Sequence, residues 1–184
     1  LFIQLIDVDD CEKNNFKTVK QLEIIGNEKR IPDLILYING IPLVLFEFKS
    51  AIRENATIHD AYKQLTIRYA RDIPELMKYN AFCVISDGIN NKIGSIFSNY
   101  EFFYSWRRID ETNILDTTHD TLDSLIKGVL SKKRLLDIIH NFIFFPDSNE
   151  KKDKIICRYP QYYGSINIFK RILKNIKPKG SGRG

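Results

Sequence analysis

Two apolar runs separated by a short turn dominate the hydrophobic pattern of the chain's first third. The runs cover about residues 32–38 and 42–49, are rich in Ile, Leu and Val, and flank the dipeptide Asn39-Gly40. Asn-Gly between two such runs is a strong signal for a β-hairpin. We therefore predict two antiparallel strands joined at Asn39-Gly40.

Four further segments carry strand patterns. Looser alternation of apolar and polar positions predicts strands over Leu1–Val8 and Thr18–Ile25. The continuous apolar run of residues 81–86 is typical of a strand that is buried on both faces. Residues Lys92–Phe97 then predict a short outer strand.

Residues 55–70 have the periodicity of an amphipathic helix. Thr57 is followed three positions later by Asp60, which resembles a capping box. Apolar residues recur at spacings of four, three and four. These residues are Ile58, Tyr62, Leu65 and Tyr69. A strand, a helix and a strand in this order predict a crossover connection, and therefore a parallel strand pair.

Beyond Asp110 the pattern becomes helical. Helices are predicted over Thr118–Val129, Ser131–Phe142 and Ile166–Ile176. We place a domain boundary near residue 117, between an α/β domain of residues 1–117 and a helical region of residues 118–184. The fold class predicted overall is mixed α/β, with a central mixed sheet flanked by helices and followed by a helical segment.

Three charged residues interrupt the apolar hairpin: Asp33, Glu47 and Lys49. Burying an unpaired charge costs several kcal/mol, so such residues are usually functional or tightly paired. Pro32-Asp33 followed by Glu47-x-Lys49 resembles the active-site signature of the PD-(D/E)xK nucleases. The alternative is a buried ion pair of Lys49 with Glu47 or Asp33 on a solvated sheet face.

The register of the hairpin decides whether these charges can act together. Alternation places Glu47 and Lys49 on one face of their strand. A regular hairpin with a two-residue turn would pair Asp33 with Phe46, and Asp33 would then face away from Glu47. A shared site therefore predicts a three-residue loop or a β-bulge in this hairpin.

The chemistry of such a site is metal-assisted hydrolysis. Two carboxylates on adjacent strands, with a backbone carbonyl, supply the oxygen ligands that Mg²⁺ prefers. The metal generates hydroxide near neutral pH, and a lysine on the same face orients water or stabilises negative charge. Gln64 and Arg68 lie one helical turn apart and could extend the site toward a DNA phosphate; the alternative is a solvated helix face.

Composition narrows the possibilities further. A net charge of +5 and a pI of about 9.0 suit a polyanionic partner such as nucleic acid. The three cysteines have no spacing typical of zinc sites or disulfide scaffolds, and reduced thiols in a cytoplasmic protein are expected. No apolar run approaches the roughly 20 residues of a membrane span, so no membrane association is expected.

The ordered set of motifs resembles one family, the R subunit (HsdR) of type I restriction endonucleases. The first motifs that show this resemblance are Ile31-Pro-Asp33, Asn39-Gly40 and Pro42-Leu-Val-Leu-Phe-Glu47-Phe-Lys49. They are followed by Asp60-Ala-Tyr-Lys-Gln64-Leu, Arg71-Asp-Ile-Pro-Glu-Leu and Val84-Ile-Ser-Asp-Gly88. Further motifs are Phe103-Tyr-Ser-Trp106-Arg, Leu135-Leu-Asp-Ile-Ile-His-Asn-Phe142 and Arg158-Tyr-Pro-Gln161-Tyr. The resemblance spans nearly the whole chain.

The resemblance implies an N-terminal PD-(D/E)xK endonuclease domain that cuts double-stranded DNA after ATP-driven translocation by a following helicase-like motor. It assigns Mg²⁺ binding to Asp33 and Glu47, and catalysis to Lys49. Partners would be the methyltransferase and specificity subunits of the restriction complex. No Walker A sequence is present, so ATP is expected to act only in the full-length protein. The rival interpretation is a non-catalytic module with a nuclease fold that docks partner subunits or DNA.

Two further residues follow from the resemblance. The family has a Gln-x-x-x-Tyr element on the helix after the lysine, which is thought to aid cleavage. Gln64 fits this element as a catalytic and DNA-binding residue, but the tyrosine is Tyr69, five positions on, and Arg68 occupies the fourth. Arg68 and Tyr69 are the further DNA-binding candidates. Gln161 resembles the glutamine that recognises adenine just ahead of the motor's phosphate loop.

Overall fold

The structure, a computed structural model, describes residues 3–50, 57–109, 122–146 and 153–176. In these ranges one mixed sheet has the strand order β1-β4-β5-β6-β7, and two short ribbons pair β2 with β3 and β8 with β9. The strands of the sheet are β1 (Phe16–Lys20), β4 (Leu34–Ile38), β5 (Ile41–Phe48), β6 (Phe82–Ser86) and β7 (Asn91–Gly94). The ribbons are β2 (Ile24–Ile25), β3 (Lys29–Arg30), β8 (Ile143–Phe144) and β9 (Ile155–Ile156).

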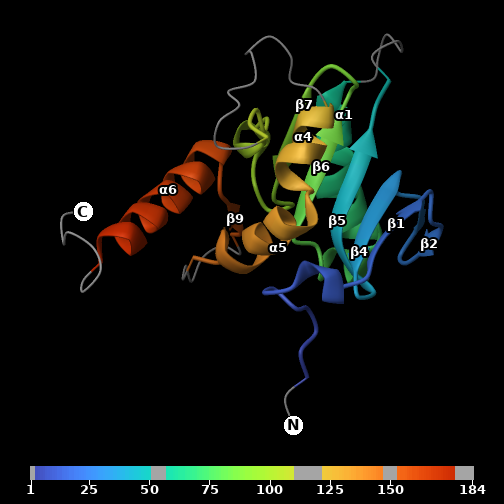
Figure 1. Cartoon of the computed structure of the whole chain (residues 1–184). Coiled ribbons are helices and arrows are strands. Elements are labelled where there is room, and N and C mark those ends of the chain that lie inside the picture. Colours follow the sequence, from blue (N-terminus) through green and yellow to red (C-terminus); the bar gives the residue numbers. More distant parts are fainter. Residues whose placement is uncertain (1–2, 51–56, 110–121, 147–152, 177–184) are drawn as a thin grey trace.

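Helices cover both faces of the sheet: α1 lies on one face, and α4 and α5 lie on the other (Figure 1). The α-helices are α1 (Ile58–Lys63), α2 (Ala70–Asp72), α3 (Pro74–Met77), α4 (Leu122–Val129), α5 (Lys132–Asn141) and α6 (Tyr159–Asn175). Two short 3₁₀ turns are η1 (Cys11–Lys13) and η3 (Tyr100–Phe102), and η2 (Gln64–Tyr69) is a π-helical segment. The predicted mixed α/β class, with a central mixed sheet flanked by helices, is confirmed.

The centre of the sheet follows the sequence pattern closely. All five residues of β6 are buried, and β6 runs parallel to β5 with Phe46 opposite Val84. Val44 and Phe46 of β5 belong to the core that includes α4 and α5, whereas Leu45 belongs to the core beneath α1. This alternation means that Glu47, two positions after Leu45, faces the layer that contains α1 and η2.

Of the two predicted alternatives, a three-residue loop and a β-bulge, the hairpin contains the β-bulge. Ile38 pairs with Ile41 across a two-residue turn in which Asn39 and Gly40 both have positive φ, 51° and 84°. The register then shifts between Leu36 and Tyr37, because Leu36 pairs with Val44 while Tyr37 pairs with Pro42. Leu43 is the extra residue. Pro42 lacks a backbone N–H, which explains why the ladder is interrupted at this point.

Two of the predicted strands are wrong at the N-terminal end. Residues 3–8 form no strand, because the carboxylate of Asp7 accepts the backbone N–H groups of Asp9 and Asp10 and closes a turn. Residues 18–25 are not one strand either. The chain leaves the sheet after Lys20, where Gln21 has a φ of 51°, and residues 24–25 instead pair with β3.

The helical region joins the same core as the sheet. Leu125 of α4, Leu135 of α5 and Tyr162 of α6 pack in one buried cluster with Val44 and Phe46. Helix α5 matches the prediction for 131–142, while the expected boundary near 117 and the start of the helix predicted from 118 lie outside the described residues.

Helix α6 begins at Tyr159 rather than at residue 166. The Arg158 N–H donates to the side chain of Gln161, and Pro160 stands in the first turn, where its missing N–H costs nothing. The predicted capping box of the earlier helix is confirmed, since Asp60 accepts the N–H of Thr57 at 2.9 Å. Among the described helices, none combines the length and apolarity that crossing a membrane requires.

Candidate active site

The β-bulge brings Asp33 and Glu47 to the same side of the sheet. Because Leu34 pairs with Phe46, the next positions outward, 33 and 47, lie opposite each other. The Asp33 carboxylate accepts the backbone N–H of Phe48 at 2.7 Å, which fixes it at the end of β5. A hairpin without the extra residue would have put this carboxylate on the other face.

Glu47 is a nearly inaccessible carboxylate, with 1% of its surface exposed. Its Oε1 atom accepts from Lys49 Nζ at 2.6 Å, and its Oε2 atom accepts from the Tyr69 hydroxyl at 2.9 Å. Burial raises the pKa of Glu47 to about 6, an effect that the Lys49 ammonium opposes and the nearby charge of Asp33 reinforces. The Lys49–Glu47 ion pair, the alternative to a metal site, therefore exists. The charge of a second carboxylate, Asp33, also affects Glu47.

Gln64 and Tyr69 close a ring of hydrogen bonds around this pair. Lys49 Nζ donates to Gln64 Oε1 at 2.8 Å, and Gln64 Nε2 donates to the Tyr69 oxygen at 2.7 Å. Burial, with the neighbouring Glu47 charge, raises the pKa of Tyr69 far above its usual range, so the hydroxyl keeps its proton and donates to Glu47. Every member of the ring is held by two others, which restricts the position of Lys49.

The π-helical segment η2 explains how residues five positions apart share one face. In an α-helix, positions i and i+5 diverge by about 140°, since each residue turns about 100°. A π-helical turn is wider and bonds position i to position i+5. Gln64 and Tyr69 are the first and last residues of η2, and both reach the Glu47–Lys49 pair. Arg68 is exposed on the helix surface beside them.

The donor set suits a hard divalent cation. Asp33, Glu47 and Lys49 carry a net charge of −1 at a largely buried position, and a cation would offset it. In the described part of the chain, one oxygen of the Asp33 carboxylate accepts a hydrogen bond from Phe48. Because an ionised carboxylate has about four lone-pair positions in all, Asp33 keeps positions for a metal. No group of three or more His, Cys, Asp or Glu side chains in the described ranges could hold a metal, so further ligands would be backbone carbonyls or water.

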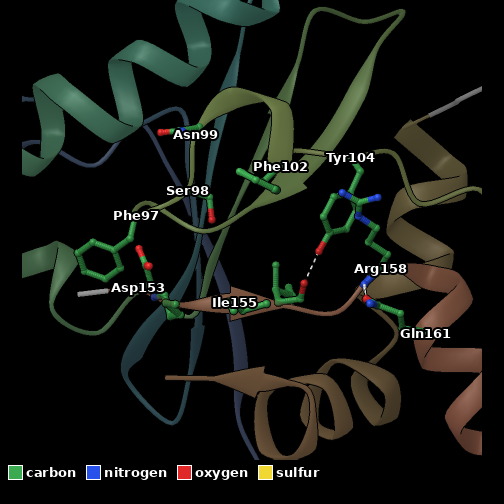
Figure 2. Close-up of a pocket in the computed structure, with 11 residues that line it drawn as sticks. Phe97, Ser98, Asn99, Phe102, Tyr104, Asp153, Ile155, Arg158 and Gln161 are labelled. Atoms are coloured by element: carbon green, nitrogen blue, oxygen red, sulfur yellow. Dashed lines mark hydrogen bonds between the residues drawn. The ribbon is translucent and has the colours of Figure 1, made fainter. Parts of the chain in front are cut away.

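Gln161 lies elsewhere, at the edge of a hollow of about 380 Å³ between residues 97–104 and the segment that leads into α6 (Figure 2). Phe97, Phe102 and Tyr104 contribute aromatic surface, and the guanidinium of Arg158 lies 5.1 Å from the ring centre of Tyr104. Gln161 Oε1 accepts the N–H of Arg158 at 2.8 Å. The structure thus separates Gln161 from the Asp33–Glu47–Lys49 group.

Sequence reasoning missed the cations next to the ring. Lys29, Arg30 and Arg71 line a hollow that also includes Gln64, Arg68 and Tyr69. The available signal was the basic pair Lys29-Arg30 directly before Ile31-Pro-Asp33, since residues this close in sequence to Asp33 also lie near it in space.

Comparison with known proteins gives one consistent family. Residues 1–102 match the family described as the type I restriction enzyme R protein N terminus. The chain is 40% identical to the type I restriction enzyme HindI endonuclease subunit of Haemophilus influenzae, over 98% of this chain and 18% of that protein. It is 31% identical to a protein named "Putative type I restriction enzyme MjaIXP endonuclease subunit" of Methanocaldococcus jannaschii, over 95% of this chain and again 18% of the relative. The chain therefore spans less than a fifth of the length of both relatives.

Proposed function

Because the chain belongs to the family of the type I restriction enzyme R protein N terminus, we propose that it is a Mg²⁺-dependent DNA endonuclease domain. The observation that carries this proposal is the ring formed by Glu47, Lys49, Gln64 and Tyr69, with Asp33 beside it. A structural ion pair needs neither the second carboxylate nor the glutamine. Metal-assisted phosphodiester hydrolysis uses both a cation site and a fixed cationic group that stabilises the developing charge.

Asp33 and Glu47 are the residues that would hold Mg²⁺. When bound there, the metal would supply a hydroxide nucleophile and positive charge next to the phosphate. The chain's own contribution is to keep both carboxylates on one face through the β-bulge, and to keep Glu47 away from solvent. Burial strengthens each electrostatic interaction in the site, because few water dipoles remain to screen it.

Lys49 is the catalytic cation in this proposal. Its ammonium group donates to Glu47 and Gln64 and retains a third proton for a phosphate oxygen or a water molecule. Gln64 restrains the lysine, and Tyr69 restrains both Gln64 and Glu47. Gln64 and Arg68 lie where they could contact the DNA backbone, whereas Tyr69, with 1% of its surface exposed, is better placed to position Glu47 than to touch DNA.

The larger protein would provide the remaining activities. By analogy with the endonuclease subunits that the chain resembles, we propose that it acts in the cytoplasm on double-stranded DNA, within a complex that includes methyltransferase and specificity subunits. ATP would be used by a motor domain outside this chain. We propose that Gln161 contacts the adenine base of that ATP. The aromatic lining of the hollow beside Gln161 is suited to a flat ligand (Figure 2).

The deciding experiment combines metal binding with cleavage. In the assembled restriction complex, Asp33→Asn, Glu47→Gln and Lys49→Met should each reduce the DNA cleavage rate by at least a hundredfold, with translocation unchanged. Calorimetric titration with Mg²⁺ or Mn²⁺ should show binding that Asp33→Asn and Glu47→Gln abolish. Retained cleavage in any variant would remove that residue from the mechanism. Absence of metal binding, even with DNA present, would favour the non-catalytic docking module.

A further inference from the structure

A cationic hollow adjoins the hydrogen-bonded ring. It has a volume of about 330 Å³, and four basic residues line it together with Ile31, Gln64 and Tyr69. The basic residues are Lys29, Arg30, Arg68 and Arg71. The lining contains no carboxylate among the residues that the structure describes. Four cations around one small hollow repel one another, so an anion bound there would relieve an unfavourable charge distribution.

Two of the arginines are fixed from behind by one buried carboxylate. Asp72 is 1% exposed and accepts from Arg30 Nε and from Arg71 Nε, both at 2.6 Å. Its pairing with Arg71, together with Arg30, lowers the pKa of Asp72 to about 2, so it stays ionised. One negative charge thus serves two guanidinium groups, and one positive charge remains uncompensated. Arg71 also donates a terminal nitrogen to Asp72, and Arg30 donates a terminal nitrogen to the Lys29 carbonyl. The remaining N–H donors of these two preorganised arginines, together with their charge, are suited to a phosphate oxygen.

Arg68 adds a cation that has no ion-pair partner within the described ranges. It is exposed and precedes Tyr69 on η2. Lys29 contributes less positive charge to the hollow, because it pairs with Glu23 at 2.9 Å. This pair is exposed, and exposed pairs are weak and easily exchanged. The positive charge available to a ligand is therefore concentrated on the arginines.

Gln64 connects the hollow to the candidate catalytic lysine. Its side chain lines the hollow and also accepts from Lys49 at 2.8 Å. We propose that this hollow binds a phosphodiester group of the DNA strand next to the one that is hydrolysed. This inference rests on the proposed nuclease function, and it assigns Arg30 and Arg71, with Arg68, to backbone binding. Such contacts would position the strand without reading its sequence, as phosphate contacts do generally.

The test measures how salt affects DNA binding by the full 184-residue chain in EDTA, so that cleavage does not interfere. Each protein–phosphate contact contributes about 0.9 to the slope of log K against log salt concentration. The double variant Arg68→Gln/Arg71→Gln should make that slope about one to two units less steep and weaken binding several-fold. The matched control, Arg171→Gln/Lys174→Gln, removes two exposed cations from α6 and should leave the slope unchanged. Helix α6 lies on the opposite side of the molecule from β2, the strand that pairs with Lys29–Arg30 (Figure 1).

Arg71 also holds Asp72, so the double variant could lose stability. The single variant Arg68→Gln avoids this, because its side chain is exposed, and it should lower the slope by about one unit. The inference is overturned if the chain does not bind duplex DNA, if neither variant changes the slope, or if the α6 control changes it equally. Cleavage that depends on Asp33, combined with an unchanged slope, would overturn this subsite while leaving the nuclease proposal intact.

Discussion

Gln64 and Tyr69 are five residues apart on one helix, yet their side chains are hydrogen-bonded at 2.7 Å because the segment between them is π-helical. The family element that Gln64 resembles has its tyrosine four residues on, so the resemblance implies one extra residue in this chain. A π-helical turn accommodates one extra residue without rotating the rest of the helix, so the tyrosine still faces Glu47.

Deletion of Ile67 should consequently preserve the site. Ile67 is 57% exposed within η2, and its removal would bring Gln64 and the tyrosine to α-helical spacing. We expect a folded chain with an unchanged or higher melting temperature and a cleavage rate within about fivefold of the parent, since α-helical bonding replaces the rarer π form.

The matched control is deletion of Lys63, which shortens the same helix by one residue at its exposed face before η2. Deletion of Lys63 would rotate Gln64 by about 100° about the helix axis, away from Lys49. The π-helical turn between Gln64 and Tyr69 would absorb the missing residue, so the tyrosine would keep its place. Cleavage should therefore fall far more than in the Ile67 deletion. Equal loss in both deletions would show that the π-helical turn is not an accommodated insertion.

Tyr69→Phe should shift the pH dependence of cleavage rather than unfold the chain. The ring stays buried, but Glu47 Oε2 loses its hydroxyl donor. Because that hydrogen bond lowers the pKa of Glu47, its loss should raise this pKa further above about 6. The half-maximal point of the pH–rate profile should move to higher pH, with a stability loss of about 1–3 kcal/mol. Tyr79→Phe, at an exposed tyrosine, is the control and should change neither quantity.

The sequence was sufficient to predict the hairpin and the need for an extra residue in it. Asn39-Gly40 favours a two-residue turn, and the alternation of side chains then requires an extra residue if Asp33 is to face Glu47. That argument predicted either a three-residue loop or a bulge, and it did not choose between them; the structure has the bulge and keeps the two-residue turn. The position of the bulge follows from Pro42, which has no N–H to donate to the ladder. A proline in a strand favours a bulge nearby but does not fix its position.

Local side-chain contacts explain most of the remaining errors. The alternation of Leu1–Val8 is compatible with a strand, but Asp7 caps a turn within it. The apolar pattern gave no signal for the π-helical turn, because Leu65 and Tyr69 also fit an α-helical apolar face. The available hint was the five-residue spacing of Gln64 and Tyr69, one more than in the family element, and the contacts of Gln64 with Lys49 and Tyr69 show how the chain accommodates it.

Glu47 should make the chain less stable as the pH rises through the range of about 4.5 to 6. Its pKa is raised from 4.5 in the unfolded chain to about 6 in the fold, so the folded state binds more protons in this interval. The free energy of unfolding should fall by about 2 kcal/mol across it, at 1.36 kcal/mol per pKa unit. Denaturant titration of Glu47→Gln should lack this decrease, while Glu75→Gln, at an exposed carboxylate paired with Lys78, should retain it.

The same carboxylate should make Mg²⁺ binding depend on pH. Oxygen ligands bind the metal when ionised, so below a pH of about 6 Mg²⁺ must displace a proton from Glu47. We expect the association constant to rise up to tenfold per pH unit below that value and to level off above it. Calorimetry in buffers of different ionisation enthalpy should detect the released proton at a pH of about 5.5 and little release at about 8. An association constant that is flat across this range would place the metal away from Glu47, at Asp33 alone or outside the ring.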